Sequence, residues 1–115
     1  MNHEMGLFET PFHSIKSGRK KVEVRLYDEK RRNIKVGDTI TFTKLPEKDA
    51  TLTVEVTELR QYPSFKAMYE AIPAGDFDAV GDSIDEMVEQ TYHIYTPEKE
   101  KEWGTVAITI KLEET

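Results

Sequence analysis

The fold of this chain is set by a stretch in which the end of one element passes into a strand: Gly18-Arg19-Lys20-Lys21-Val22-Glu23-Val24-Arg25. Gly18 and Arg19 end the first element, and from Lys21 onward charged and apolar side chains alternate. Such alternation is typical of a half-buried strand. The sequence therefore predicts a strand over residues 21–27 whose charged row is a candidate for holding an anion.

Composition limits the classes of function. The 115 residues fit a single domain that spans 1–115. Because there is no cysteine, disulfides, thiol nucleophiles and thiolate metal sites are excluded. The formal charge of -6 argues against coating of duplex DNA, since that binding neutralises many phosphates, but it permits a small nucleotide site. No apolar run is long enough for a membrane helix, so we expect a soluble cytoplasmic protein without a membrane partner.

Hydrophobic periodicity predicts the remaining elements. Alternating apolar residues predict four more strands: 3–8, 39–43, 51–59 and 105–112. Apolar residues three and four apart, with capping residues before them, predict three helices: 10–18, 64–73 and 83–96. Of two polar segments, 28–33 is expected to be a turn or a single helical turn, and 98–102 a turn of helix. The resulting order, β-α-β-β-β-α-α-β, favours an α+β fold in which a mixed, mostly antiparallel sheet curls into a small barrel with helices beside it.

Three segments resemble, in order, the landmarks of the ASCH domain, a member of the PUA-like superfamily: Phe12 to Arg25, Lys35 to Ile40, and Trp103 to Ile108. The first pairs a helix that ends in Gly-(Arg/Lys)-Lys with a strand that ends in Arg. The second is a Gly-Asp turn into a strand, and the third is the closing strand. The resemblance implies a PUA-like β-barrel with a cleft beside the Gly-Lys segment, and a partner that is RNA or a modified nucleoside.

Some small bacterial ASCH proteins are amidohydrolases that remove the acetyl group from N4-acetylcytidine with a Lys, a Thr and a Glu. The resemblance places that Lys on Lys20 and that Thr on Glu23, and puts the third position near Val80, between Asp78 and Asp82. Our first hypothesis is therefore an RNA- or nucleoside-binding domain. The alternative is a hydrolase that cleaves the C–N amide bond of an acylated nucleoside. A ribonuclease and a protein-interaction module are further alternatives.

Lys20 and Glu23 are the candidate catalytic residues. A lysine acts as a nucleophile or base only when burial or nearby positive charge favours its neutral form, and Arg19, Lys21 and Arg25 could supply that charge. Otherwise Lys20 is a solvated cation at a helix end. Glu23 could accept hydrogen bonds from the amino edge of a cytosine-like base or act as a general base. It could equally form a surface ion pair.

The candidate ligand-binding residues are six in number: Gly18, Arg19, Lys21, Arg25, Tyr92 and Trp103. Arg25 offers a planar cation suited to phosphate or carboxylate, or else a structural bridge to an acidic residue. Gly18 would allow a ligand to approach the backbone closely. Tyr92 and Trp103 could stack on bases, whereas Tyr95 shares an apolar stripe and is expected in the core. The histidines have no spacing typical of a metal site: His3, His13 and His93. We expect neither a metal nor another cofactor.

Overall fold

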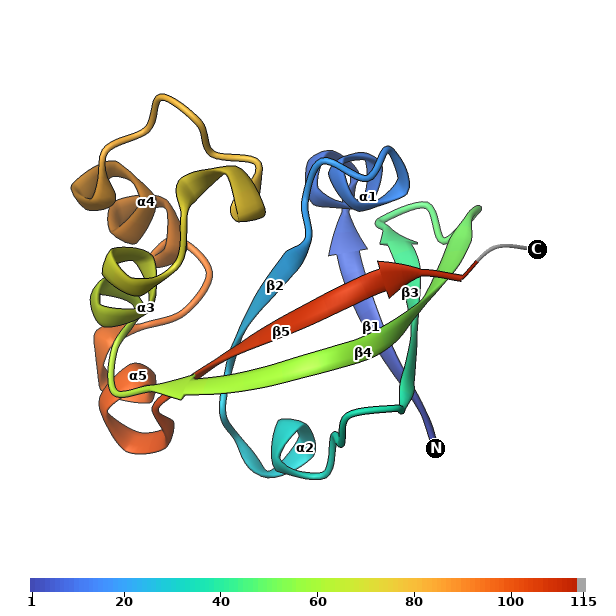
Figure 1. Cartoon of the computed structure of the whole chain (residues 1–115), viewed down its shortest axis with the longest axis horizontal. Coiled ribbons are helices and arrows are strands. Elements are labelled where there is room, and N and C mark those ends of the chain that lie inside the picture. Colours follow the sequence, from blue (N-terminus) through green and yellow to red (C-terminus); the bar gives the residue numbers. More distant parts are fainter. Residues whose placement is uncertain (114–115) are drawn as a thin grey trace.

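The computed structural model describes residues 1–113, and its centre is a five-stranded sheet that curls into an open barrel (Figure 1). The strands are β1 (Asn2–Phe8), β2 (Val22–Leu26), β3 (Thr39–Leu45), β4 (Thr51–Tyr62) and β5 (Thr105–Leu112). Their order in the sheet is β1-β3-β4-β5-β2, with β1 and β3 parallel and the other pairs antiparallel. The two edge strands, β1 and β2, therefore flank the open side of the barrel.

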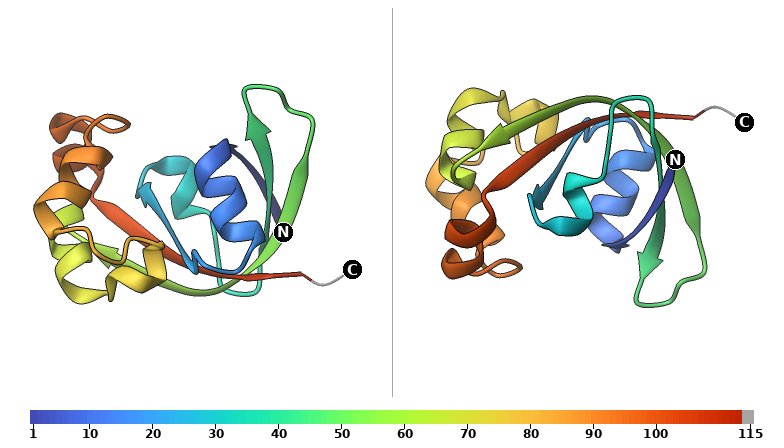
Figure 2. Two further views of the ribbon diagram at one scale, coloured as in Figure 1. Left: turned by 90° about the horizontal axis from the view of Figure 1, so that it is seen from above. Right: turned by 90° about the horizontal axis from the view of Figure 1, so that it is seen from below.

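Short helices connect and cover the strands: α1 (Glu9–Lys16), α2 (Glu29–Arg32), α3 (Phe65–Ala71), the 3-10 helix η1 (Ala74–Phe77), α4 (Ile84–Thr91) and α5 (Pro97–Trp103). Seen from above and below, α1 lies on the concave side of the curled sheet, whereas α3, α4 and α5 gather on one side of it (Figure 2). No helix within residues 1–113 is both long and apolar enough to cross a membrane.

The sheet separates two hydrophobic cores. The first fills the barrel and joins α1 to the inner faces of the strands through residues such as Phe12, Ile15, Ile40, Phe42 and Val54. The second joins β2 and β5 to the helices through residues such as Val22, Phe65, Met68, Phe77 and Met87. The strand β2 contributes Val22, Leu26 and the partly buried Val24 to this second core.

This position of β2 corrects one expectation. The alternation in its sequence predicted a half-buried strand with a charged row, but all of its residues except the half-buried Val24 are buried. Glu23 is 3% exposed and Arg25 is 9% exposed. Lys21 lies just before the strand and is exposed. The charged face of β2 is thus turned to the inside of the curled sheet and toward the cavity, since Glu23 and Arg25 pair with Ile108 and Val106 of the first core.

The predicted fold class and element order are confirmed, with differences in detail. The polar segments 28–33 and 98–102 form the short helices α2 and α5, in agreement with the expected turns of helix, whereas the break after α3 contains η1. The helix α4 ends at Thr91, so Tyr95 is not on its apolar stripe. After Thr91 the backbone N–H groups of His93 and Ile94 bond to carbonyls three residues back, which closes the helix into a turn.

Candidate functional site

A cavity of about 390 Å³ lies at the open side of the barrel, between the edge strands and the helices. Leu7 and Phe8 of β1 line one wall, and Glu23 and Arg25 of β2 line another, with Lys20 just before β2. The volume falls in the range of roughly 300–1,000 Å³ that small-molecule sites occupy. The five strands do not close the barrel here, and this gap leaves room for a ligand.

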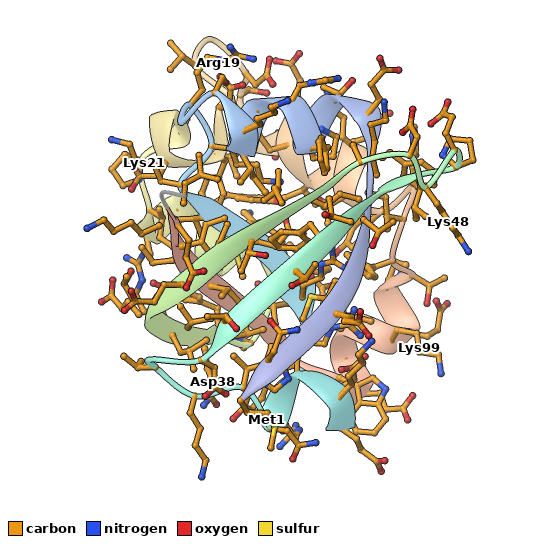
Figure 3. The ribbon with its side chains drawn as sticks, turned by 90° about the vertical axis from the view of Figure 1, so that its right-hand side faces the viewer. Met1, Arg19, Lys21, Asp38, Lys48 and Lys99 are labelled. Atoms are coloured by element: carbon orange, nitrogen blue, oxygen red, sulfur yellow. The ribbon has the colours of Figure 1, made fainter. Side chains whose placement is uncertain are left out.

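The turn after α1 directs Lys20 toward the cavity. Gly18 has a φ of +81°, a left-handed conformation that glycine adopts without steric cost. The backbone N–H groups of Arg19 and Lys20 then both donate to the carbonyl of Ser14, at 3.0 and 3.1 Å. The N–H of Lys21 donates instead to the carbonyl of Asp76, at 2.8 Å. Arg19 and Lys21 consequently lie at the outside of the molecule (Figure 3).

Glu23 is the centre of a buried charge cluster. Its Oε1 lies 2.9 Å from Nζ of Lys20 and accepts the backbone N–H of Val24 at 3.2 Å. Its Oε2 lies 2.9 Å from Nε and 2.7 Å from Nη2 of Arg25. Nη2 of Arg25 also donates to the carbonyl of Gly6 on β1, at 3.0 Å. Arg25 therefore bridges the two edge strands that the sheet leaves unpaired.

The electrostatics of the cluster follow from this pairing. Burial alone would raise the pKa of Glu23, but the charges of Lys20 and Arg25 and their hydrogen bonds lower it to about 2. Burial opposes the charge of Arg25 as well, yet Glu23 and the neighbouring Tyr95 hydroxyl raise the Arg25 pKa. Glu23 is therefore an ionised carboxylate at neutral pH, and all of its acceptor positions already have donors.

This arrangement favours binding over proton transfer by Glu23. A general base works best when its pKa lies near the operating pH, and the Glu23 pKa is far below that. Lys20 carries three N–H donors and Arg25 carries five, of which only some are directed at Glu23 and Gly6. The cavity wall thus presents cationic donors to a ligand, without a free carboxylate acceptor from Glu23.

The helical wall of the cavity is apolar and aromatic. Tyr69 and Phe77 meet edge to face with ring centroids 5.1 Å apart, and both line the cavity with Met87. The hydroxyl of Thr91 donates to the carbonyl of Met87 at 2.8 Å, so the Tyr69 hydroxyl donates to Thr91, at 2.6 Å. Tyr95 also lines the cavity. The site is therefore a slot with apolar sides and a cationic wall.

The segment between η1 and α4 is fixed to the end of α1. Oδ2 of Asp78 accepts the hydroxyl of Ser14 at 2.7 Å and Nε of Arg19 at 3.1 Å. These two hydrogen bonds, that of Ser14 first, lower the pKa of Asp78. Val80 is 84% exposed, whereas Asp82 lines the cavity. Of the acidic residues near the third expected position, Asp82 is therefore the one at the cavity.

Tyr92 and Trp103 lie away from the cavity. The Tyr92 hydroxyl donates to Oε1 of Glu100 at 2.6 Å, and this hydrogen bond raises the pKa of Tyr92 to about 12. Trp103 lines a second hollow beside Tyr27 and Arg32. Gly18 and the side chains of Arg19 and Lys21 also lie outside the cavity lining. Of the residues expected from the sequence, the structure brings together Lys20, Glu23 and Arg25.

The helical wall was not recognised from the sequence as part of a site. Tyr69, Met87 and Thr91 lie on apolar helix stripes, a pattern that indicates core, and all three are indeed largely buried. Their second role, as cavity lining, depends on how the helices face β2 across the open side of the barrel. No feature of their spacing distinguishes the two roles.

Comparison with known proteins gives a consistent picture. The sequence model of the ASCH domain matches residues 5–114. The crystal structure of hypothetical protein PH0355 is 43% identical, with a TM-score of 0.88, and the match covers 98% of this chain and 100% of that one. The solution NMR structure of protein PF0455 from Pyrococcus furiosus is 42% identical, with a TM-score of 0.78 and complete coverage of both chains. No curated protein matches.

Proposed function

We infer that this chain, which belongs to the ASCH domain family, binds a nucleoside, free or within single-stranded RNA, in the cavity beside Lys20. One observation carries the proposal: a cavity of about 390 Å³ whose sides are apolar and aromatic has the paired cations Lys20 and Arg25 on one wall. A planar base fits between apolar walls, and its carbonyl oxygens and ring nitrogens are acceptors for the cationic donors.

In this proposal Glu23 is a positioning residue. Its carboxylate holds Nζ of Lys20 at 2.9 Å and the guanidinium of Arg25 at 2.7 Å, so it fixes the direction of the donors that a base would meet. It does not read the amino edge of the base, because its lone pairs are taken by Lys20, Val24 and Arg25. Pre-orientation of this kind lowers the entropic cost of binding.

Deacylation of an N4-acylated cytidine is the second candidate, because Lys20 faces the cavity within reach of a bound base. That reaction needs a group that accepts a proton, and the pKa of about 2 makes Glu23 a weak base at neutral pH. A lysine is activated when it is buried in an apolar pocket or lies beside another cation. Lys20 instead has the carboxylate of Glu23 as its neighbour, at 2.9 Å, and a carboxylate favours the charged form of a lysine. These two features favour the binding function.

The test is calorimetric titration of the protein with cytidine and with N4-acetylcytidine, on the wild type and on Lys20→Ala. Loss of a charged hydrogen bond costs about 1.5–3 kcal/mol, so we expect the variant to bind roughly 10–100-fold more weakly. Lys21→Ala is the matched control, because it removes the same charge from the neighbouring exposed position. Equal affinity in both variants, or no binding by the wild type, contradicts the proposal.

The same samples test the hydrolase. After incubation with N4-acetylcytidine, the nucleosides are separated by chromatography, and the binding function predicts that no cytidine is formed. Enzyme-dependent cytidine that disappears in Lys20→Ala and persists in Lys21→Ala would instead establish deacylation as the function.

A further inference from the structure

A second hollow, of about 300 Å³, lies at the opposite end of β2 from Lys20. Tyr27, Tyr62 and Trp103 contribute aromatic rings to it, and Arg32 enters from α2. The guanidinium carbon of Arg32 is 4.4 Å from the centroid of the Tyr27 ring and 5.9 Å from that of Trp103. The cavity proposed above does not include any of these residues.

Arg32 is held in place by the backbone. Its Nε donates to the carbonyl of Tyr27 at 2.8 Å, and its Nη2 donates to the carbonyl of Trp103 at 3.3 Å. Although Arg32 is an exposed residue, no acidic side chain within residues 1–113 forms an ion pair with it. An oriented guanidinium beside aromatic rings has N–H donors available for phosphate and a planar face on which a base can stack.

Charge is strongly segregated along the chain. Residues 18–33, which run from the cavity to this hollow, contain seven basic and three acidic side chains, a formal charge of +4. The other 99 residues then carry -10, because the whole chain carries -6. A polyanion would therefore be attracted to this segment and repelled elsewhere. The seven steps along the chain from Lys20 to Tyr27 span up to about 23 Å at the usual rise of a strand.

Tyr95 lines the cavity, and Arg31 belongs to α2, the helix that carries Arg32. Nη1 of Arg31 bonds to Asp28 at 3.1 Å, while its Nε is buried and has no hydrogen-bond partner among the described residues. The basic segment thus continues from the cavity to Arg32.

We propose that the hollow formed by Tyr27, Arg32 and Trp103 is a second nucleotide site, in which a base of the same single-stranded RNA stacks while its phosphate bonds to Arg32. The inference rests on the proposed function, since the cavity holds one nucleotide of the strand and the hollow holds another. An isolated nucleoside occupies the cavity alone, and an oligonucleotide long enough to reach both sites binds more tightly.

The chain provides its own reporter, because Trp103 is its one tryptophan. Cytidine, a cytidine dinucleotide and a cytidine hexamer are titrated while calorimetry measures affinity and tryptophan fluorescence reports the hollow. We expect heat without a fluorescence change for cytidine, and tighter binding with a changed Trp103 signal for the hexamer. Hexamer affinity falls as salt rises, since phosphates are neutralised.

Arg32→Ala should weaken hexamer binding about tenfold, because stacking on one base is worth roughly 1–3 kcal/mol, and should leave cytidine affinity within twofold. Lys66→Ala, an exposed lysine on α3, is the control for loss of one positive charge. If Arg32→Ala lowers the melting temperature, the titration is repeated with Tyr27→Leu. That variant removes an aromatic ring of the hollow but keeps the backbone carbonyl to which Arg32 donates.

The outcomes separate the two proposals. Cytidine binding with no gain for the hexamer, or a hexamer that leaves Trp103 fluorescence unchanged, overturns the second site and leaves the cavity intact. The second site is also overturned if a folded Arg32→Ala or Tyr27→Leu variant binds the hexamer as tightly as the wild type does. Binding of neither ligand overturns both.

Discussion

Glu23 shows how a single buried residue can fix the side chains on the wall of a cavity. It is 3% exposed, and both of its oxygens are bonded to the cations Lys20 and Arg25 or to the backbone. Removing one partner of a buried ion pair leaves uncompensated charge in a poorly solvated position, which is more costly than the loss of a surface pair. The cluster is therefore important both for the shape of the cavity and for the stability of the fold.

Glu23→Gln should lower the free energy of unfolding by about 3 kcal/mol, because it leaves Lys20 and Arg25 without their shared anion. Urea denaturation measures this value. The control is Glu58→Gln, whose carboxylate pairs with Arg60 at 3.5 Å but is 56% exposed, and whose loss should change stability by less than about 1 kcal/mol. If the two variants lower the free energy of unfolding by similar amounts, the buried cluster stabilises the fold no more than an exposed ion pair does.

At this scale the sequence indicated three residues that the structure brings together at the cavity, but not how they pair. Lys20, Glu23 and Arg25 were recognised because they follow a Gly turn and open a strand. Whether Lys20 or Lys21 faces the cavity depends on where the strand begins, and the N–H of Lys21 settles this by bonding to Asp76, which is distant in sequence. The low pKa of Glu23 likewise depends on side-chain distances. The sequence therefore does not distinguish a glutamate that acts as a general base from one that is held in an ion pair.

Among the elements, the junction of α3, α4 and α5 depends on one buried carboxylate. Oε2 of Glu100 accepts the backbone N–H of Phe65, at the first residue of α3, at a distance of 2.7 Å. Its Oε1 accepts the hydroxyl of Tyr92, which follows α4. A carboxylate at a helix N-terminus satisfies a backbone donor and interacts favourably with the helix dipole. Glu100 thereby connects three elements that share few other polar contacts.

Tyr92→Phe should lower the free energy of unfolding by about 1 kcal/mol, the typical net value of one hydrogen bond, since it removes the donor to Glu100. Thermal or urea unfolding measures the change, with Tyr62→Phe as control because the structure gives the Tyr62 hydroxyl no hydrogen bond within residues 1–113. Affinity for cytidine should stay within twofold. A large loss of cytidine affinity at unchanged stability would instead assign Tyr92 to the ligand.

Local sequence signals predicted the elements well wherever nearby residues supply the hydrogen-bond partners of the backbone. The capping box of Ser83 and Glu86 is present, with the two reciprocal bonds at 3.0 and 3.1 Å. The end of α4 was placed too late because the apolar stripe continues in sequence as far as Tyr95. Tyr95 packs against the second core from the turn after the helix, so burial rather than helicity explains its apolar spacing.

For the molecule as a whole, the two carboxylates whose pKa values fall to about 2 contribute to the response to acid. The pKa of Glu23 falls from its usual 4.5 to about 2, because Lys20 and Arg25 outweigh the effect of burial. The pKa of Asp38 falls from 3.8 to about 2, chiefly through hydrogen bonds from His3 at 2.8 Å and the backbone N–H of Lys35 at 3.0 Å. Asp38 lies beside Met1, at the base of β1 and β3 (Figure 3).

Because both values are lower in the folded state, the unfolded chain binds protons first as the pH falls. The stabilisation by these groups is complete above about pH 4.5 and is lost progressively toward pH 2. Urea midpoints between pH 7 and pH 2 should therefore fall steeply below pH 4.5, and Glu23→Gln with Asp38→Asn should reduce that slope. Asp49→Asn, at an exposed position, should not. If the wild type, the double variant and Asp49→Asn lose stability equally steeply below pH 4.5, Glu23 and Asp38 do not contribute to the acid response.

The sequence by itself determined the class of fold, because alternation, capping residues and Gly or Pro breaks act over a few neighbouring positions. It also marked the charged run from Gly18 to Arg25, since charge is counted without coordinates. Only the tertiary structure decided that the sheet stays open between β1 and β2, that the charged face of β2 turns to the inside of the sheet, and that Arg25 bridges the gap to Gly6. These features depend on contacts between residues far apart in the chain, which no local pattern encodes.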